Sequence, residues 1–162
     1  MRFCKTPTIF YLYFLFNLFP ESVPCSAAGI SLIGTTGSFT SPNYPNNYPS
    51  STTCRWIITV PVGRRVKMTF QTFNLETCNI PSTCTCDHVK IRDGKDGSST
   101  ELKEFCGGRT PGLTPILSSE QFMWIEFDSD SSTERTGFNA TYTAVGTESY
   151  FSLLPLLNQS YF

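Results

Sequence analysis

Short runs that alternate apolar with polar residues, separated by clusters of Gly, Pro, Asn and Ser, recur along this chain. Alternation places the apolar side chains of an extended strand on one face, and a helical spacing of 3.6 residues never holds here for three turns. Such half-polar strands are typical of antiparallel sheets with one solvated face. The pattern therefore predicts an all-β fold, an antiparallel β-sandwich. The residues expected to point inward are Cys54, Trp56, Ile58, Val60, Val66, Met68, Phe70, Val89, Ile91, Met123, Ile125, Phe127, Phe138, Ala140 and Tyr142.

The N-terminus has the order of charge, apolar core and break that is typical of a secretory signal peptide. Arg2 and Lys5 precede an apolar run over 9–19, which is too short to cross a bilayer. We expect residues 1–24 to be the signal peptide, with cleavage between 22 and 28, since small residues occur throughout that window. The mature protein is accordingly expected to be secreted and extracellular.

Seven cysteines in a short exported chain indicate a disulfide framework, because disulfides persist in an oxidising compartment. Cys4 lies within the expected signal peptide. Cleavage after Ala27 or Ala28 would also remove Cys25 and leave Cys54 unpaired, so parity favours an earlier cleavage. The cysteines expected to form disulfides are Cys25, Cys54, Cys78, Cys84, Cys86 and Cys106.

The net charge of the chain argues against one class of ligand, and its C-terminal segment argues against membrane attachment. A net charge of -1 with scattered basic residues excludes a broad electrostatic surface for nucleic acid. The segment 146–162 includes an apolar stretch over 150–157 that contains Pro and is too short for a membrane span or a lipid-anchor signal. We interpret this segment as a disordered or packed tail, with a truncated link to a further domain as the alternative.

An ordered series of motifs occupies about residues 34–145. The motifs are Ser41-Pro42-Asn43-Tyr44-Pro45 with Tyr48-Pro49, Cys54-Arg55-Trp56-Ile57-Ile58, Phe73-Asn74-Leu75-Glu76, Cys84-Thr85-Cys86-Asp87-His88-Val89, Phe105-Cys106-Gly107, Met123-Trp124-Ile125-Glu126-Phe127 with Asp128-Ser129-Asp130, and Gly137-Phe138-Asn139-Ala140-Thr141-Tyr142. Taken together, the series resembles the CUB domain. This resemblance implies a disulfide-bridged, jelly-roll-like β-sandwich and assigns 25–145 to one such domain.

The same resemblance implies a calcium site, because the calcium-binding CUB domains bring three acids together at one end of the sandwich. Here those acids are Glu76, Asp87 and Asp130, and the main-chain carbonyl of Ser132 is a further expected ligand. Ca2+ takes about six to eight oxygen ligands, which suits three carboxylates. The negative charge left over would receive Lys or Arg side chains of a protein partner. One departure from the family pattern is Cys86, which stands where a Tyr usually precedes the Asp.

The resemblance also implies disulfide pairs. Cys84 and Cys106 match one family disulfide, and Cys54 matches half of another, with Cys25 as its remaining partner. The additional cysteines, Cys78 and Cys86, are expected to pair with each other. The alternative pairing, Cys78 with Cys84 and Cys86 with Cys106, stays open from the sequence.

Other surface features suggest glycans and a second kind of ligand. Asn139 and Asn158 lie in glycosylation sequons, and alternation places Asn139 on the outer face. The alternative to a calcium-dependent protein-binding module is a carbohydrate- or surface-binding module that is independent of calcium and uses exposed Tyr44, Tyr48 and Trp124. We expect no enzymatic activity, because the single histidine has no recognisable nucleophile in its context.

Overall fold

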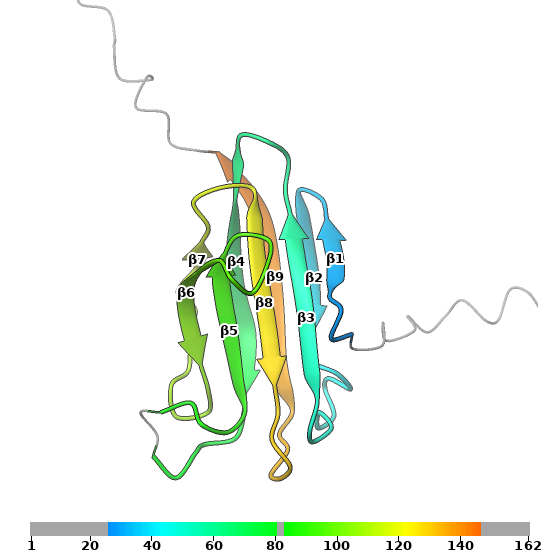
Figure 1. Ribbon diagram of the computed structural model, residues 1–162, viewed down its shortest axis with the longest axis vertical. Coiled ribbons are helices and arrows are strands. Elements are labelled where there is room, and N and C mark those ends of the chain that lie inside the picture. Colours follow the sequence, from blue (N-terminus) through cyan, green and yellow to red (C-terminus); the bar gives the residue numbers. More distant parts are fainter. Residues whose placement is uncertain (1–25, 81–82, 147–162) are drawn as a thin grey trace, which may run out of the picture.

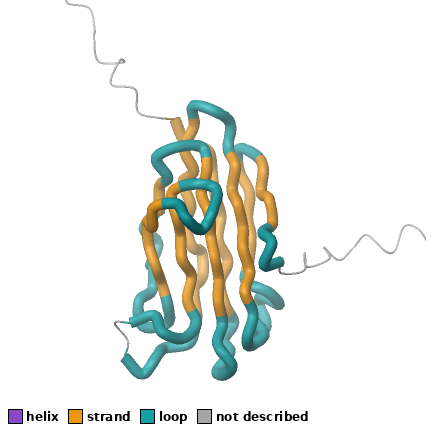
Figure 2. The backbone as a smooth tube through the Cα atoms, in the orientation of Figure 1, coloured by secondary structure: helices purple, strands orange, loops and turns teal. Residues whose placement is uncertain are grey.

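The computed structural model describes residues 26–80 and 83–146, which form β-strands joined by loops (Figures 1 and 2). The expected signal peptide 1–24 and the tail beyond residue 146 lie outside the described residues. The strands, in chain order, are β1 (Ile30–Ile33), β2 (Thr36–Thr40), β3 (Thr53–Thr59), β4 (Arg64–Asn74), β5 (His88–Asp93), β6 (Thr100–Phe105), β7 (Ile116–Leu117), β8 (Phe122–Asp128) and β9 (Gly137–Gly146).

These strands form two sheets that face each other. One sheet has the order β1-β3-β8-β5-β6, and the other has the order β2-β9-β4-β7. The pairs are antiparallel, with the exception that β1 runs parallel to β3 along the edge of the larger sheet. The prediction of an all-β sandwich built on antiparallel pairing is therefore confirmed.

The core lies between the sheets and consists of the alternating residues that the sequence pattern predicts. Each of the predicted inward residues is at most 6% exposed. Aromatic rings make edge contacts across the core, with Phe138 5.5 Å from Phe70 and 5.9 Å from Phe127 between ring centroids. Full burial of such side chains contributes about 1.5 to 3 kcal/mol each to folding, so the hydrophobic layer drives the two sheets together.

One outward residue departs from the alternation. Trp124 lies on the outer face of β8, yet it is only 6% exposed. The Arg92 guanidinium carbon lies 5.9 Å from the ring centroid, and the turn at Gly97 packs against the ring edge. The expectation that Trp124 is an exposed aromatic is therefore wrong, because a neighbouring turn and a cation cover it.

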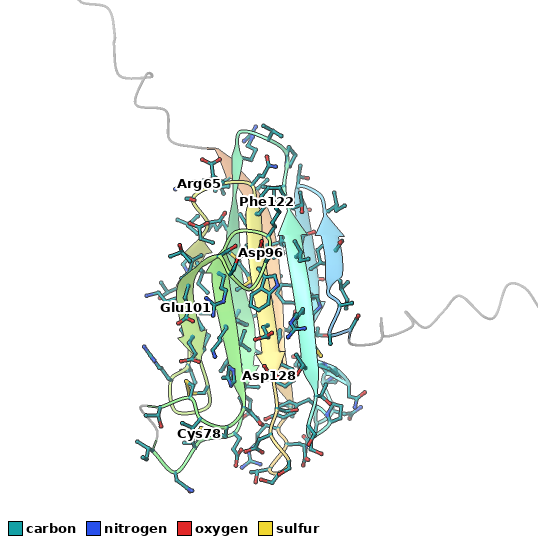
Figure 3. All side chains as sticks on the ribbon, in the orientation of Figure 1. Arg65, Cys78, Asp96, Glu101, Phe122 and Asp128 are labelled. Carbon is teal, nitrogen blue, oxygen red and sulfur yellow. A yellow bond between two sulfur atoms is a disulfide. The ribbon has the colours of Figure 1, made fainter. Side chains whose placement is uncertain are left out.

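Loops from both sheets meet at one end of the sandwich, the lower end in Figure 1, which includes the connections 41–52, 75–87 and 129–136. Figure 3 shows Cys78 in this loop cluster. The strands end here because Pro, Ser and Asp interrupt the alternation, so polar side chains gather beyond the core. Within the described ranges, no helix has the length and apolar character needed to cross a membrane.

Candidate metal centre

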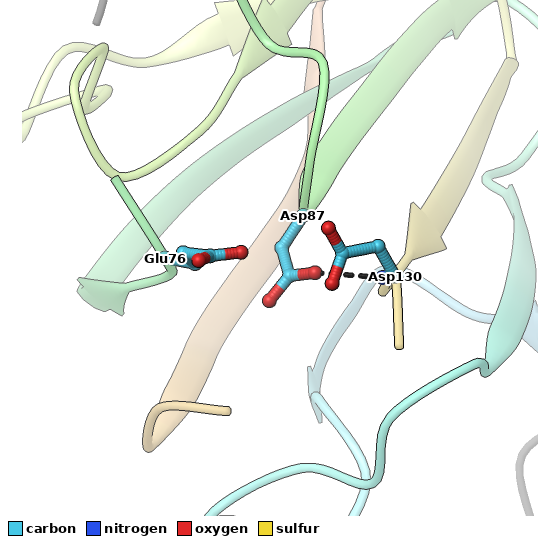
Figure 4. A group of neighbouring side chains, drawn as sticks. All are labelled: Glu76, Asp87 and Asp130. Atoms are coloured by element: carbon cyan, nitrogen blue, oxygen red, sulfur yellow. Dashed lines mark hydrogen bonds between the residues drawn. The ribbon is translucent and has the colours of Figure 1, made fainter. Parts of the chain in front are cut away.

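Three carboxylates meet at this loop end of the sandwich. Glu76 follows the end of β4, Asp87 directly precedes β5, and Asp130 follows the end of β8. One ligand oxygen from each lies within 4.8 Å of the others (Figure 4). Neighbouring strand ends from both sheets thus bring together acids that are far apart in sequence, as the sequence analysis predicts.

Asp87 is the buried centre of the group, with no exposed surface. Its Oδ1 accepts a hydrogen bond of 2.8 Å from the Asp130 backbone N–H, and its Oδ2 accepts one from the Tyr48 hydroxyl. Burial raises the pKa of Asp87, and the charges of Asp130 and Glu134 raise it further, while the two hydrogen bonds oppose the shift. The two hydrogen bonds fix the orientation of the Asp87 carboxylate, but its ionised form is unfavourable unless a positive charge lies beside it.

Tyr48 supports the site, and the sequence analysis does not assign it that role. Its ring is 1% exposed and makes an edge contact with Phe127, with 5.1 Å between the centroids. Its hydroxyl also accepts a 3.2 Å hydrogen bond from the Glu76 backbone N–H, and burial followed by the Asp87 hydrogen bond raises its pKa. The expectation of an exposed Tyr48 is wrong, because the ring fills the space between the loops. The sequence feature that could have indicated this supporting role is the Tyr48-Pro49 motif.

Asp130 presents the exposed side of the group. The Ser132 backbone N–H donates a 2.9 Å hydrogen bond to Asp130 Oδ1, and the Ser51 backbone N–H donates one of 2.5 Å to the Asp130 carbonyl oxygen. The loop after β8 is therefore tied to the loop before β3. Ser132 contacts Asp130 through its N–H, and the ligand role expected for its carbonyl stays a prediction.

Glu76 carries the clearest sign of a missing partner. Its Oε2 is buried and has no hydrogen-bond partner among the described residues. Buried polar atoms are almost always paired with protein, water or an ion. Three carboxylates with one unpaired buried oxygen are hard oxygen donors, which Ca2+ prefers. The residues present therefore fit a calcium ion.

Two disulfides flank the acids. Cys78 bonds to Cys86, and Cys84 bonds to Cys106, with Cα–Cα distances of 5.8 and 5.5 Å. Both expected pairs are thus formed, the family pair Cys84–Cys106 and the additional pair Cys78–Cys86, and the alternative pairing is not. Cys25 lies outside the described residues, so its predicted bond to Cys54 stays a prediction.

The predicted glycosylation sites have different positions. Asn139 is half-buried on the outer face of β9, between Thr40 of β2 and Thr72 of β4 in the sheet register. Its neighbours Phe138 and Ala140 point into the core. Asn158 lies outside the described residues.

The chain is similar in sequence to known proteins. The family model of the CUB domain matches residues 25–142. Cubilin from Sus scrofa is 42% identical over 122 residues, which cover 74% of this chain and 3% of cubilin. The chain therefore spans only a small part of this relative's length.

Solved structures agree with the family match. The CUB1-EGF-CUB2 domains of rat MASP-1 align with a TM-score of 0.65 and 38% identity, covering 74% of this chain and 44% of that one. The MASP-1 CUB2 domain bound to Ca2+ aligns with a TM-score of 0.63 and 33% identity, covering 74% of this chain and 99% of that one.

Proposed function

The chain belongs to the CUB domain family, whose members are extracellular protein-interaction modules, and we propose that it binds protein partners through a Ca2+-ordered acidic site. The proposed ligands are Glu76, Asp87, Asp130 and the Ser132 carbonyl, and the proposed partner groups are exposed Lys or Arg side chains. We propose that the protein reaches the extracellular space by secretion, directed by residues 1–24.

One observation carries this proposal, namely the convergence of three carboxylates, of which the buried Glu76 Oε2 has no hydrogen-bond partner in the described part of the chain. Like charges held this close repel one another unless a cation or protons compensate them. The Ca2+-bound MASP-1 CUB2 domain, which has a similar fold, supports a calcium ion as the compensating charge.

The acidic residues have two proposed roles, to hold the ion and to present negative charge to a partner. A bound Ca2+ would supply two positive charges and a demand for oxygen ligands. Asp87, fully buried and oriented by two hydrogen bonds, serves as the fixed ligand. Asp130 is exposed, so its carboxylate remains accessible to a partner's ammonium or guanidinium group. Charge-assisted hydrogen bonds of that kind are stronger than neutral ones.

The calcium-independent carbohydrate alternative has less support. Tyr48 and Trp124 are 1% and 6% exposed, so neither offers a ring face to a sugar. Tyr44 is half-buried, and its hydroxyl accepts a hydrogen bond from Thr72. We also propose no catalytic role, because the His88 ring lies with Nδ1 2.9 Å from the Cys86 carbonyl oxygen, a contact that anchors the loop.

Thermal unfolding of the secreted protein with excess Ca2+ and with chelator tests the ion site. A ligand that binds only the folded state at about 100 times its Kd stabilises by roughly 2.7 kcal/mol, so Tm should rise by several degrees. The variant Asp130→Ala should lose this rise, while Asp96→Asn, an exposed acid on a distant turn, should retain it. An equal rise in Asp130→Ala would contradict the site.

A lysine-rich peptide immobilised on a sensor surface tests the partner chemistry. We expect binding in Ca2+, loss of binding in chelator, and no binding to the same peptide with acetylated lysines, because acetylation removes the charge. Equal binding to the acetylated peptide would show that Lys recognition is wrong even if the ion site is correct.

A further inference from the structure

We propose that the Cys78–Cys86 disulfide is a positioning element of the calcium site, which raises the affinity for Ca2+ by holding the Glu76 main chain beside Asp87. This inference rests on the proposed function. It assigns the additional disulfide to the ion site.

The connection between β4 and β5 explains why such an element is needed. It passes from one sheet to the other, with Glu76 near its start and Asp87 at its end. Two ligands of one ion are therefore anchored to different layers. The disulfide closes this connection, because Cys78 lies two residues after Glu76 and Cys86 directly precedes Asp87.

Contacts inside the loop place the disulfide against the Glu76 backbone. Sγ of Cys86 lies 3.9 Å from the Glu76 carbonyl oxygen, and the Cys86 backbone N lies 3.2 Å from Sγ of Cys78. The same carbonyl accepts a 2.9 Å hydrogen bond from the Gly107 N–H. The Glu76 main chain is thus held between the Cys86 sulfur and the loop after Cys106.

Glu76 depends on this support more than the other two acids do. The Asp87 and Asp130 carboxylates each accept at least one hydrogen bond that fixes their orientation. Glu76 Oε2 is buried and has no hydrogen-bond partner among the described residues. The position of the Glu76 carboxylate therefore depends on its main chain. If that main chain were more mobile, Ca2+ binding would have to order it, and the loss of conformational entropy would lower the affinity for Ca2+.

The described residues between Cys78 and Cys86 add little to the core, although Cys78 itself is only 7% exposed. Ile80 is 61% exposed, and Asn79, Thr83 and Thr85 are exposed as well. Cys106, by contrast, is fully buried beneath the sheet ends. Loss of the Cys78–Cys86 bond should accordingly cost ion affinity more than it costs packing.

The test is a calorimetric Ca2+ titration of the wild type and of the double variant Cys78→Ser/Cys86→Ser, which leaves no unpaired thiol from this pair. Altered support around metal ligands typically costs about 10- to 100-fold in affinity, so we expect a Kd at least about tenfold higher in the variant. Near-UV circular dichroism and Tm in chelator report separately on the fold. A merely structural disulfide would lower Tm in chelator and leave the Kd unchanged.

A second pair, Cys78→Ala/Cys86→Val, puts an apolar side chain in place of the serine hydroxyl at the buried position 78 and is used if the serine variant does not fold. Asp96→Asn is the matched control and should keep the wild-type Kd. If the wild type binds Ca2+ and a folded double variant binds it equally tightly, the positioning role is overturned while the ion site stands. If the wild type shows no Ca2+ binding, the proposed function fails, and the positioning role fails with it.

Discussion

The hydroxyl of Tyr48 donates a hydrogen bond to Oδ2 of Asp87, and this buried contact joins the loop before β3 to the start of β5. The Tyr48 hydroxyl oxygen also accepts a 3.2 Å hydrogen bond from the Glu76 backbone N–H. One ring, itself packed on Phe127, therefore orients one acid through its carboxylate and another through its main chain. The acidic site is built outward from the hydrophobic core.

Tyr48→Phe should weaken both the fold and the ion site. The change leaves a buried carboxylate oxygen and a backbone N–H unpaired, which costs roughly 1 to 3 kcal/mol, and we expect Ca2+ affinity to fall by about tenfold or more. Urea unfolding in chelator and Ca2+ calorimetry measure the two effects. Tyr44→Phe, which removes a hydroxyl that accepts a hydrogen bond from exposed Thr72, should change neither.

The pKa of Asp87 predicts how stability without Ca2+ depends on pH. Its pKa is raised in the folded protein, chiefly by burial and then by Asp130 and Glu134, so the folded state binds this proton more tightly than the unfolded state does. The resulting stabilisation is present below the unfolded pKa and is lost as pH rises through the raised value.

The difference in unfolding free energy between wild type and Asp87→Asn isolates this contribution. In chelator, the wild type should lose stability relative to the variant as pH rises from about 4 toward neutrality. With Ca2+ present the trend should reverse for the wild type, because the ion binds the deprotonated acid. A difference that stays constant with pH in chelator would contradict the raised pKa.

Gly107→Ala should disrupt the support beneath Glu76. A Cβ at this position would lie 2.3 Å from the carbonyl oxygens of Leu75 and Glu76, which are main-chain atoms with little freedom to move. Overpacking of this kind costs about 1 to 3 kcal/mol, so Tm in chelator should fall by several degrees and Ca2+ affinity should also decrease. Gly146→Ala is the control, because its added Cβ meets only Arg64 Nη1, at 3.9 Å.

Asn139 is expected to carry a glycan when the protein is secreted by cells. Its side chain lies on the outer face of β9, where the neighbouring positions are Thr40 and Thr72. Asn139→Gln should lower the mass by one glycan and leave Ca2+ binding intact, because the acids lie in the loops at the end of the sandwich. Intact-mass spectrometry of the wild type and the variant, before and after deglycosylation, measures this glycan. A wild type whose mass does not change on deglycosylation would contradict the prediction.

The local alternation of apolar and polar residues was sufficient to predict which residues lie between the two sheets. Every second residue of an extended strand faces the same way, so Ile58, Met68 and Phe138 could be assigned to the core without knowledge of their neighbours. The motif order then brought Glu76, Asp87 and Asp130 into one hypothesis, and the structure places their oxygens together.

Features that depend on neighbours distant in sequence were not predictable in this way. Tyr48 is buried because three loops close over it, and Trp124 is covered because the Gly97 turn folds back onto the outer face.

The sequence by itself therefore determined the β-sandwich, its core residues and the acids of the candidate site, because strand periodicity and the order of the motifs can be recognised from the sequence alone. Only the tertiary structure decided the parallel pairing of β1 with β3, the burial of Tyr48 against Asp87, and the burial of Glu76 Oε2 without a hydrogen-bond partner in residues 26–80 and 83–146. These depend on distances between segments far apart in sequence, which are set by how the two sheets pack and how their loops close over the end.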